Sequence, residues 1–354
     1  MTVYNFCAGP AMLPADVMTK ARNEFLNFQD LGVSVMEISH RSSPYIALAE
    51  EAEQNLRDLM GIPDDYAVLF MHGGARGQFS AVPLNLLGEG KALYLNSGQW
   101  SDAAGVEAAK YGTVETRDLR RSAGDLDLGD LGDTRGYRYV HYCPNETVNG
   151  TALFDLPQVD SPLVADMSSC ILGREVEVSK FGLIYAGAQK NAGPAGLALV
   201  IVRRDLLGQA DPKTPAILDY ALADKTDSMY NTPPTYPWYL AGEVFKWVKT
   251  QGGVAAVAEN NRAKADRLYQ FIDDSPFYRN EVAAHCRSEM NVTFQLQDTA
   301  LDARFLREAE AAGLMALEGH RMVGGMRASL YNAMPMAGVE ALIAFMSRFE
   351  QEHV

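Results

Sequence analysis

The chain has 354 residues, of which 47% are hydrophobic, so it is long enough to bury the cores of two domains. Its 31 basic and 45 acidic residues give a formal net charge of −14, which excludes the basic surface typical of nucleic-acid binding. We find no run of about 18 apolar residues, so no membrane span is expected.

The cysteines and the N-terminus indicate a reducing compartment. The four cysteines follow no metal-binding spacing, and no metal site is expected from them: Cys7, Cys143, Cys170 and Cys286. The N-terminal residues lack the basic and apolar regions of a signal peptide. Reduced thiols and a cytoplasmic location are therefore expected.

From about residue 45 to residue 250, apolar strand-like runs alternate with helical stretches, which is typical of an α/β domain with a mostly parallel sheet. A helix is predicted over 45–60, with Pro44 near its first turn and Gly61 after its end. Strands are predicted at 66–71, 91–95, 138–142 and 163–166, and one more just before Lys190. The segment 117–136, rich in Gly and Asp, is predicted to be an exposed loop.

The pattern changes after residue 250. A long helix is predicted over 254–272, a half-exposed strand over 290–297, and amphipathic helices over 301–312 and 338–350. We therefore place a domain boundary near Gly253. The predicted organisation is a large α/β domain over 16–253 and a small α+β C-terminal domain over 254–354, with the N-terminal segment 1–15 packed on the small domain.

Lys190 stands where an apolar strand gives way to a loop of small residues. Lysine stems normally lie along a surface and keep the ammonium in water, but a buried amine loses its charge more easily and can act as a nucleophile in a Schiff base. From these residues alone, a surface lysine in a turn is an equally open interpretation.

Asp166 closes the apolar run 163–166, and two serines follow after Met167. An aspartate at the carboxyl end of a parallel strand lies in the ligand crevice of an open α/β sheet. A Schiff-base lysine together with an aspartate for a pyridinium nitrogen is typical of pyridoxal phosphate sites. The alternative, an aspartate that caps a helix or a turn, is common in general.

The glycine-bearing segment 72–77 follows a predicted strand and opens a predicted helix. Backbone N–H groups at a helix N-terminus suit an anion. The segment matches neither the P-loop nor the dinucleotide-binding pattern, so it is a weak signal by itself.

Several segments, taken together, resemble the phosphoserine aminotransferases, which are class V members of the fold-type I pyridoxal phosphate-dependent aminotransferases. The matching segments are 5–14, 39–41, 72–79, 141–147, 185–191, 231–235 and 319–329. The resemblance implies a large domain with a mostly parallel mixed sheet, a smaller α+β domain, and pyridoxal 5'-phosphate as cofactor. It also implies reversible transfer of the amino group of L-glutamate to 3-phosphohydroxypyruvate, which gives O-phospho-L-serine and 2-oxoglutarate in L-serine biosynthesis. The same family can act on 4-phosphohydroxy-L-threonine in pyridoxine biosynthesis.

The resemblance also implies roles around the cofactor. Lys190 would be the anchor and the catalytic base, and Asp166 would face the ring nitrogen. The remaining cofactor-binding residues are Trp100 on the ring, Thr147 beside the phenolic oxygen, Ala75, Arg76 and Gln189 on the phosphate, and Asn231 and Thr232 reaching that phosphate from a second subunit. A homodimer with shared sites follows. A core tryptophan and a capping threonine are the plainer readings of Trp100 and Thr147.

On the substrate side, Arg327 resembles the ligand of the α-carboxylate, a task that suits the planar guanidinium fork. Two His-Arg pairs would hold the distal phosphate or carboxylate, although such pairs are ordinarily solvated surface residues: His40, Arg41, His320 and Arg321. Two places depart from the family. Cys7 and Ala8 stand where relatives often have serines, and Ala75 stands where they often have glycine, so a backbone that needs positive φ there would be strained.

Two other functions stay open from the sequence. Another class V enzyme, such as a cysteine desulfurase or an alanine–glyoxylate aminotransferase, is the nearest one. Desulfurases typically carry a histidine shortly before the lysine, and here Gly187-Ala188-Gln189 precedes Lys190. A non-catalytic carrier of pyridoxal phosphate is the other, and the substrate-side cations argue against it.

Overall fold

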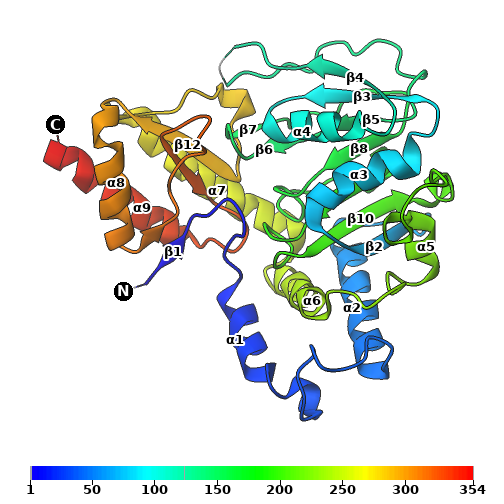
Figure 1. Ribbon diagram of the computed structural model, residues 1–354. Helices are drawn as coiled ribbons and strands as arrows, with labels where there is room; N and C mark the ends of the chain where they lie inside the picture. The colour runs from blue at the N-terminus through cyan, green and yellow to red at the C-terminus, as the bar shows by residue number, and fades with distance from the viewer. Residues whose placement is uncertain (1, 123, 354) are drawn as a thin grey trace.

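The computed structural model describes residues 2–122 and 124–353, which form a large and a small part (Figure 1). The large part is built on a seven-stranded sheet with strand order β2-β10-β9-β8-β5-β3-β4. The run from β9 to β4 is parallel, whereas β10 is antiparallel to both β2 and β9. The strands are β2 (Tyr66–His72), β10 (Leu197–Arg203), β9 (Leu183–Gly187), β8 (Leu163–Asp166), β5 (Val140–Tyr142), β3 (Lys91–Asn96) and β4 (Thr113–Asp118). The predicted mostly parallel mixed sheet is confirmed.

Helices cover both faces of this sheet because its central strands β5, β8 and β9 are buried on both sides. One face packs on α2 (Ser43–Met60) and α6 (Thr235–Thr250) through a core that includes Tyr45 and Trp238. The other face packs on α3 (Gly74–Leu86), α4 (Gln99–Ala108) and α5 (Tyr220–Lys225). A two-stranded ribbon of β6 (Asn145–Glu146) and β7 (Thr151–Ala152) follows β5.

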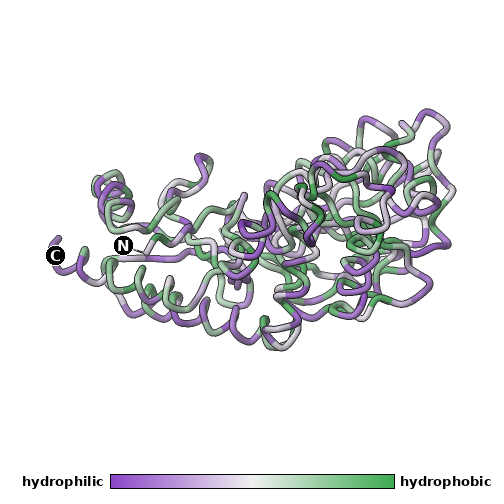
Figure 2. The backbone as a smooth tube through the Cα atoms, turned by 90° about the horizontal axis from the view of Figure 1, so that it is seen from below, coloured by the Kyte–Doolittle hydropathy of each residue, from purple (hydrophilic) through white to green (hydrophobic). Residues whose placement is uncertain are grey.

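The small part has its own core around a three-stranded antiparallel sheet. Its strands are β11 (Tyr278–Arg279), β12 (Asn291–Leu296) and β14 (Met326–Ser329), and its helices are α7 (Gly253–Asp274), α8 (Asp302–Ala311) and α9 (Met336–His353). The N-terminal strand β1 (Tyr4–Asn5) pairs in parallel with β13 (Leu314–Met315), and α1 (Ala15–Glu24) follows it. Both chain ends lie on this part, which extends away from the large one in the view from below (Figure 2).

The helix α7 joins the two parts. Val254 and Val257 near its start belong to the core of the large part, whereas Leu268 and Ile272 near its end belong to the small core. The predicted domain boundaries therefore fall where one continuous helix serves both cores, and they stay predictions. None of the described helices is long and apolar enough to cross a membrane.

The predicted exposure of 117–136 is wrong for several of its described residues. Leu119 and Thr134 are fully buried and Leu126 is 5% exposed. The backbone N–H of Ala283 donates to the carbonyl of Gly124 at 3.0 Å, so the segment is tied to the small part. Its Gly and Asp residues make tight turns, and its apolar residues reach the core of the large part.

Candidate active site

A cavity of about 630 Å³ opens between the large sheet and the small part. Its walls are segments that follow β2, β3, β5, β8 and β9, together with the N-terminal loop and two residues of the segment 320–327. Ligands of open α/β sheets bind at this edge, outside the carboxyl ends of the strands. The cavity brings together nine of the predicted residues: Ala75, Arg76, Trp100, Thr147, Asp166, Gln189, Lys190, His320 and Arg327.

The first turn of α3 forms a cradle for an anion. Gly73 and Gly74 both take positive φ, +87° and +61°, which favours glycine where β2 turns into the helix. No side chain caps this end of α3, so its first N–H groups remain for a ligand. Gly187 lies next to this turn and leaves room at its N–H groups, because a Cβ at position 187 would stand 3.1 Å from the nitrogen of Ala75. Ala75 does not take a positive φ, so alanine fits this backbone without strain.

Trp100 forms one wall beside two cations. The guanidinium carbon of Arg76 lies 5.3 Å, and Nζ of Lys190 lies 5.5 Å, from the centroid of its ring. The indole N–H donates to Oγ1 of Thr147 at 2.8 Å, which fixes the plane of the ring. Because a hydroxyl that accepts one bond can donate another, Thr147 keeps its proton for a ligand.

Asp166 lies at the end of β8 and is 5% exposed. Burial raises the pKa of its carboxyl above the ordinary value, and donors from Ser168 together with the charge of Lys190 offset only part of this rise. Ser168 donates to Oδ1 of Asp166 from its backbone N–H at 2.9 Å and from its hydroxyl at 2.5 Å. The backbone N–H of Gly187 in turn donates to the Ser168 hydroxyl at 2.9 Å. A buried carboxylate held in this way can keep a pyridine nitrogen protonated.

Arg327 supplies a half-buried positive charge on the other side of the cavity. It lies on β14, and its Nη1 donates to the carbonyl of Thr147 at 2.9 Å. Burial lowers the pKa of the guanidinium, and within the described part of the chain no carboxylate pairs with it. Burial together with the charges of Arg327 and Arg321 lowers the pKa of His320. These cations suit an anionic substrate.

The remaining predicted residues do not line the cavity. Arg41, Arg321, Asn231 and Thr232 are exposed, and His40 is partly exposed. Asn231 borders a separate cavity of about 20 Å³ next to Phe70. The single chain therefore leaves the predicted roles of these five residues untested.

Two residues that support the site were missed. Ser168 holds Asp166, and its signal was local, because a hydroxyl two residues after an aspartate can bond back to it. Glu146 accepts from the backbone N–H groups of Trp100 and Ser101, at 2.9 and 2.8 Å. No local sequence pattern predicts this contact, since about 45 residues separate the partners.

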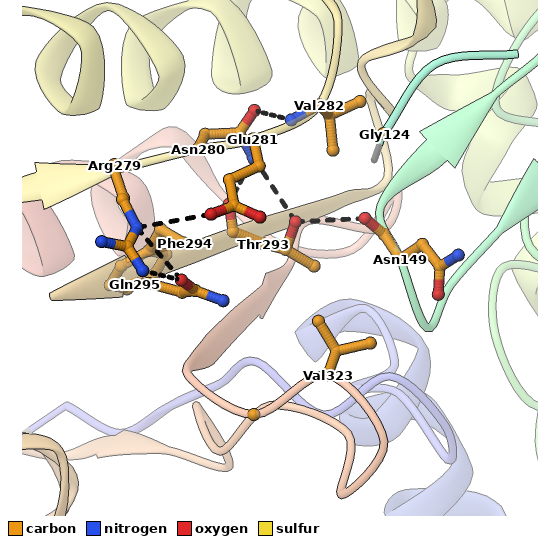
Figure 3. A pocket seen from close by; sticks show the side chains of 11 residues that line it. Gly124, Asn149, Arg279, Asn280, Glu281, Val282, Thr293, Phe294, Gln295 and Val323 are labelled. Carbon is orange, nitrogen blue, oxygen red and sulfur yellow. Dashed lines mark hydrogen bonds and ion pairs between the residues drawn. The ribbon is translucent and has the colours of Figure 1, made fainter. Parts of the chain in front are cut away.

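Two other groupings lie outside the site. A cavity of about 220 Å³ is bordered by Arg279, Glu281 and Gln295 (Figure 3). Arg279 already donates to Gln295 and pairs with Glu281 at 3.5 Å, so its guanidinium is neutralised within the protein. Near it, Asp125, His285 and Cys286 gather, but His285 pairs with Asp125 at 3.3 Å and the Cys286 thiol donates to a carbonyl. The larger cavity is therefore the candidate site.

The residues of the larger cavity fit pyridoxal phosphate. The uncapped first turn of α3 offers N–H donors for a phosphate, Asp166 offers a buried carboxylate for a ring nitrogen, and Trp100 offers a flat surface beside the amine of Lys190.

Comparison with known proteins gives a consistent result. The family model described as Aminotransferase class-V matches residues 3–342. A phosphoserine aminotransferase of Shewanella sp. (strain MR-4) is 58% identical over 359 residues, which cover 99% of each chain. The solved phosphoserine aminotransferase from Bacillus circulans subsp. alkalophilus has a TM-score of 0.95 at 41% identity, covering 99% of each chain. The PLP-bound phosphoserine aminotransferase from Trichomonas vaginalis has a TM-score of 0.90 at 38% identity, covering 98% of this chain and 99% of that one.

Proposed function

The chain belongs to the class V aminotransferases, and we propose on that basis that it transfers the amino group of L-glutamate reversibly to 3-phosphohydroxypyruvate, giving O-phospho-L-serine and 2-oxoglutarate. Its cofactor is pyridoxal 5'-phosphate. The observation that carries the proposal is that Lys190, Asp166 and the unpaired Arg327 line one cavity. Activity in pyridoxine biosynthesis stays a prediction.

The roles around the cofactor follow from positions in the cavity. Pyridoxal phosphate, when bound, supplies an electron sink for bond breaking at the substrate Cα. Lys190 would hold it covalently through Nζ, and Asp166 would face its ring nitrogen. The first turn of α3 with Arg76 and Gln189 would hold its phosphate, while Trp100 and Thr147 would contact the ring and its phenolic oxygen. Once the substrate amine has displaced it, the free amine of Lys190 would be the base that carries the proton between the substrate Cα and C4′ of the cofactor.

The substrate side must bind two molecules in turn, each with an anionic group at both ends, because the amino donor leaves before the acceptor enters. Arg327 would take the α-carboxylate that both substrates share. His320 and Arg321, together with His40 and Arg41, would take the distal group, which is a phosphate in one substrate and a carboxylate in the other. A non-catalytic carrier of the cofactor would have no use for an unpaired guanidinium in the same cavity.

The residues outside the cavity support a homodimer. Asn231, Thr232, His40 and Arg41 would reach the cavity of the partner subunit. Near the His-Arg pair, the chain exposes a run of apolar side chains that a second copy could cover: Phe25, Leu26, Leu31, Val33 and Met36. We also place the enzyme in the cytoplasm, since its four cysteines are free thiols, which a reducing compartment maintains.

The visible spectrum of the holoenzyme tests the reaction. O-phospho-L-serine and L-glutamate should each bleach the absorption band of the bound cofactor, and 3-phosphohydroxypyruvate should restore it. L-alanine and L-cysteine should leave the band unchanged. A band that responds to L-cysteine or L-alanine but ignores phosphoserine would keep the cofactor and refute the proposed substrate.

A further inference from the structure

A buried row of polar side chains joins the large part to the small part beside the cavity. On the large part, Asn145 opens β6 and Ser169 lies after β8, and both line the cavity. On the small part, Asn291 opens β12 and Ser329 closes β14. All four residues are at most 3% exposed. Because buried polar groups cost free energy unless they are hydrogen-bonded, their partners show how the two parts are held together.

The two asparagines use all of their amide protons in this row. Nδ2 of Asn145 donates to Oδ1 of Asn291 at 3.0 Å and to the hydroxyl of Ser169 at 2.8 Å. Nδ2 of Asn291 donates to the hydroxyls of Ser329 at 2.9 Å and Tyr331 at 3.2 Å. A shift of one part against the other would therefore leave buried donors and acceptors unpaired.

The ribbon of β6 and β7 also contacts the small part through its backbone. Oδ1 of Asn145 accepts from the hydroxyl of Ser288, and the backbone N–H of Ser288 donates to the carbonyl of Gly150 at 3.0 Å. Gly150 takes a φ of +72°, and a Cβ there would stand 2.8 Å from the carbonyl oxygen of Asn291. Hydrogen bonds are directional, so this close contact favours one register between the two parts.

Arg327 lies on the same strand pair as this row. In the antiparallel pair of β12 and β14, Asn291 is opposite Ser329, and Arg327 stands two residues before Ser329. Residues two apart on a strand point to the same face of a sheet. Nη1 of Arg327 donates to the carbonyl of Thr147 at 2.9 Å, and Thr147 is two residues after Asn145. The arginine contact therefore joins the same segments of the two parts as the contact between the asparagines.

We propose that Asn145 and Asn291 are positioning residues that hold the small part in the register at which Arg327 meets the substrate α-carboxylate. Lys190 belongs to the large part and Arg327 to the small one, so one substrate can reach both only if the two parts are placed accurately. A misplacement of about 1 Å is enough to slow an enzyme strongly. The inference rests on the proposed function, because it requires Arg327 to bind that carboxylate.

The test is a double-mutant cycle on the full-length holoenzyme. Asn291→Ala removes the centre of the row and should lower kcat/KM about tenfold for L-glutamate and for O-phospho-L-serine alike, the size expected when one charge-assisted hydrogen bond is lost. In the Arg327→Ala background the same change should have no further effect, because the residue that it positions is gone. The affinity for pyridoxal phosphate should not change, since its proposed contacts belong to the large part.

Two further variants separate positioning from a loss of stability. Asn85→Ala removes a similarly buried amide whose partners all belong to the large part, among them the carbonyls of Ala81 and Leu218, so kcat/KM of the folded holoenzyme should not change. Ser329→Ala removes only one acceptor of Asn291 and should lower kcat/KM by a smaller factor. This milder variant also decides the question if Asn291→Ala does not fold.

The outcomes distinguish the inference from the proposed function. If Arg327→Ala lowers kcat/KM for both substrates while Asn291→Ala and Ser329→Ala behave like Asn85→Ala, the inference is refuted and the proposed function stands. The same conclusion follows if Asn291→Ala lowers kcat/KM equally in both backgrounds. If the unmodified holoenzyme accepts neither substrate, the proposed function fails, and the inference fails with it.

Discussion

The carboxylate of Glu146 accepts a hydrogen bond from the backbone N–H of Trp100 at 2.9 Å and thereby caps the N-terminus of α4 from a neighbouring ribbon. It also accepts from Ser101, through the backbone N–H and the hydroxyl, both at 2.8 Å. Gly98 leaves the room for this contact, because a Cβ there would stand 2.7 Å from the carboxyl carbon. The place of Trp100 in the cavity therefore depends on a carboxylate 46 residues further along the chain.

Replacing Glu146 by Gln should loosen Trp100. The amide keeps the shape but loses the charge that two backbone donors and the helix N-terminus favour. We expect the free energy of unfolding to fall by about 1–2 kcal/mol and pyridoxal phosphate to bind more weakly. Urea unfolding and cofactor titration measure the two effects. Glu107→Gln, near the other end of α4, is the control, and a change no larger than in this control would contradict the role of Glu146.

Arg327→Ala should weaken both substrates alike. The variant removes two charge-assisted hydrogen bonds to the shared α-carboxylate, together worth about 3 kcal/mol, so kcat/KM should fall roughly a hundredfold for L-glutamate and for O-phospho-L-serine. Arg267→Ala in α7, which removes an exposed ion pair with Glu340, should leave both values near those of the unmodified enzyme. A loss confined to one substrate would exclude a shared carboxylate site.

Local patterns predicted most of the elements. The apolar run 66–71 is β2, the run 163–166 is β8, and the helix expected over 254–272 is α7, which begins and ends within two residues of the prediction. These patterns are informative because the buried face or faces of a helix or strand need apolar residues, which sets the spacing of apolar residues in the sequence. The same logic placed Asp166 and Lys190 in one cavity, because they end or follow neighbouring parallel strands.

Contacts between distant segments could not be predicted in this way. The Gly and Asp residues of 117–136 favoured an exposed loop, yet Leu119 is buried because the segment folds against the core of the large part. Glu146 carries no local signal for its contact with Trp100, since only the order of the strands brings the two residues together. The five predicted residues outside the cavity show a further limit, because a site completed by a partner subunit is not visible in one chain.

The buried Lys264 should give the stability of the fold a pH dependence. It is fully buried, and its ammonium donates to the carbonyls of Leu330, Tyr331 and Met334 at 2.8 to 2.9 Å, which hold the turn after the strand of Arg327. Burial lowers its pKa from 10.5 to about 7. Between these values the unfolded chain binds more protons, so the free energy of unfolding should rise with pH, by at most about 1.4 kcal/mol per pH unit.

Lys264→Met lacks this contribution. From pH 7 to pH 9 the free energy of unfolding of the unmodified protein should therefore rise relative to that of the variant. Urea unfolding at a series of pH values measures it. Lys213→Met, at an exposed lysine, should give a curve parallel to that of the unmodified protein. A parallel curve for Lys264→Met as well would show that Lys264 has an ordinary pKa.

Hybrid dimers test whether His40 and Arg41 act in the cavity of the partner subunit. Lys190→Ala and Arg41→Ala homodimers should each be nearly inactive, because every site carries a lesion. In a hybrid dimer, one site would combine an intact Lys190 with an intact Arg41 from the other subunit, so random mixing should restore about a quarter of the activity. Mixing Lys190→Ala with Arg327→Ala is the control, and it should restore none, because both residues line the cavity of their own chain. If the Arg41 mixture also restores none although mass spectrometry detects hybrid dimers, Arg41 serves its own subunit.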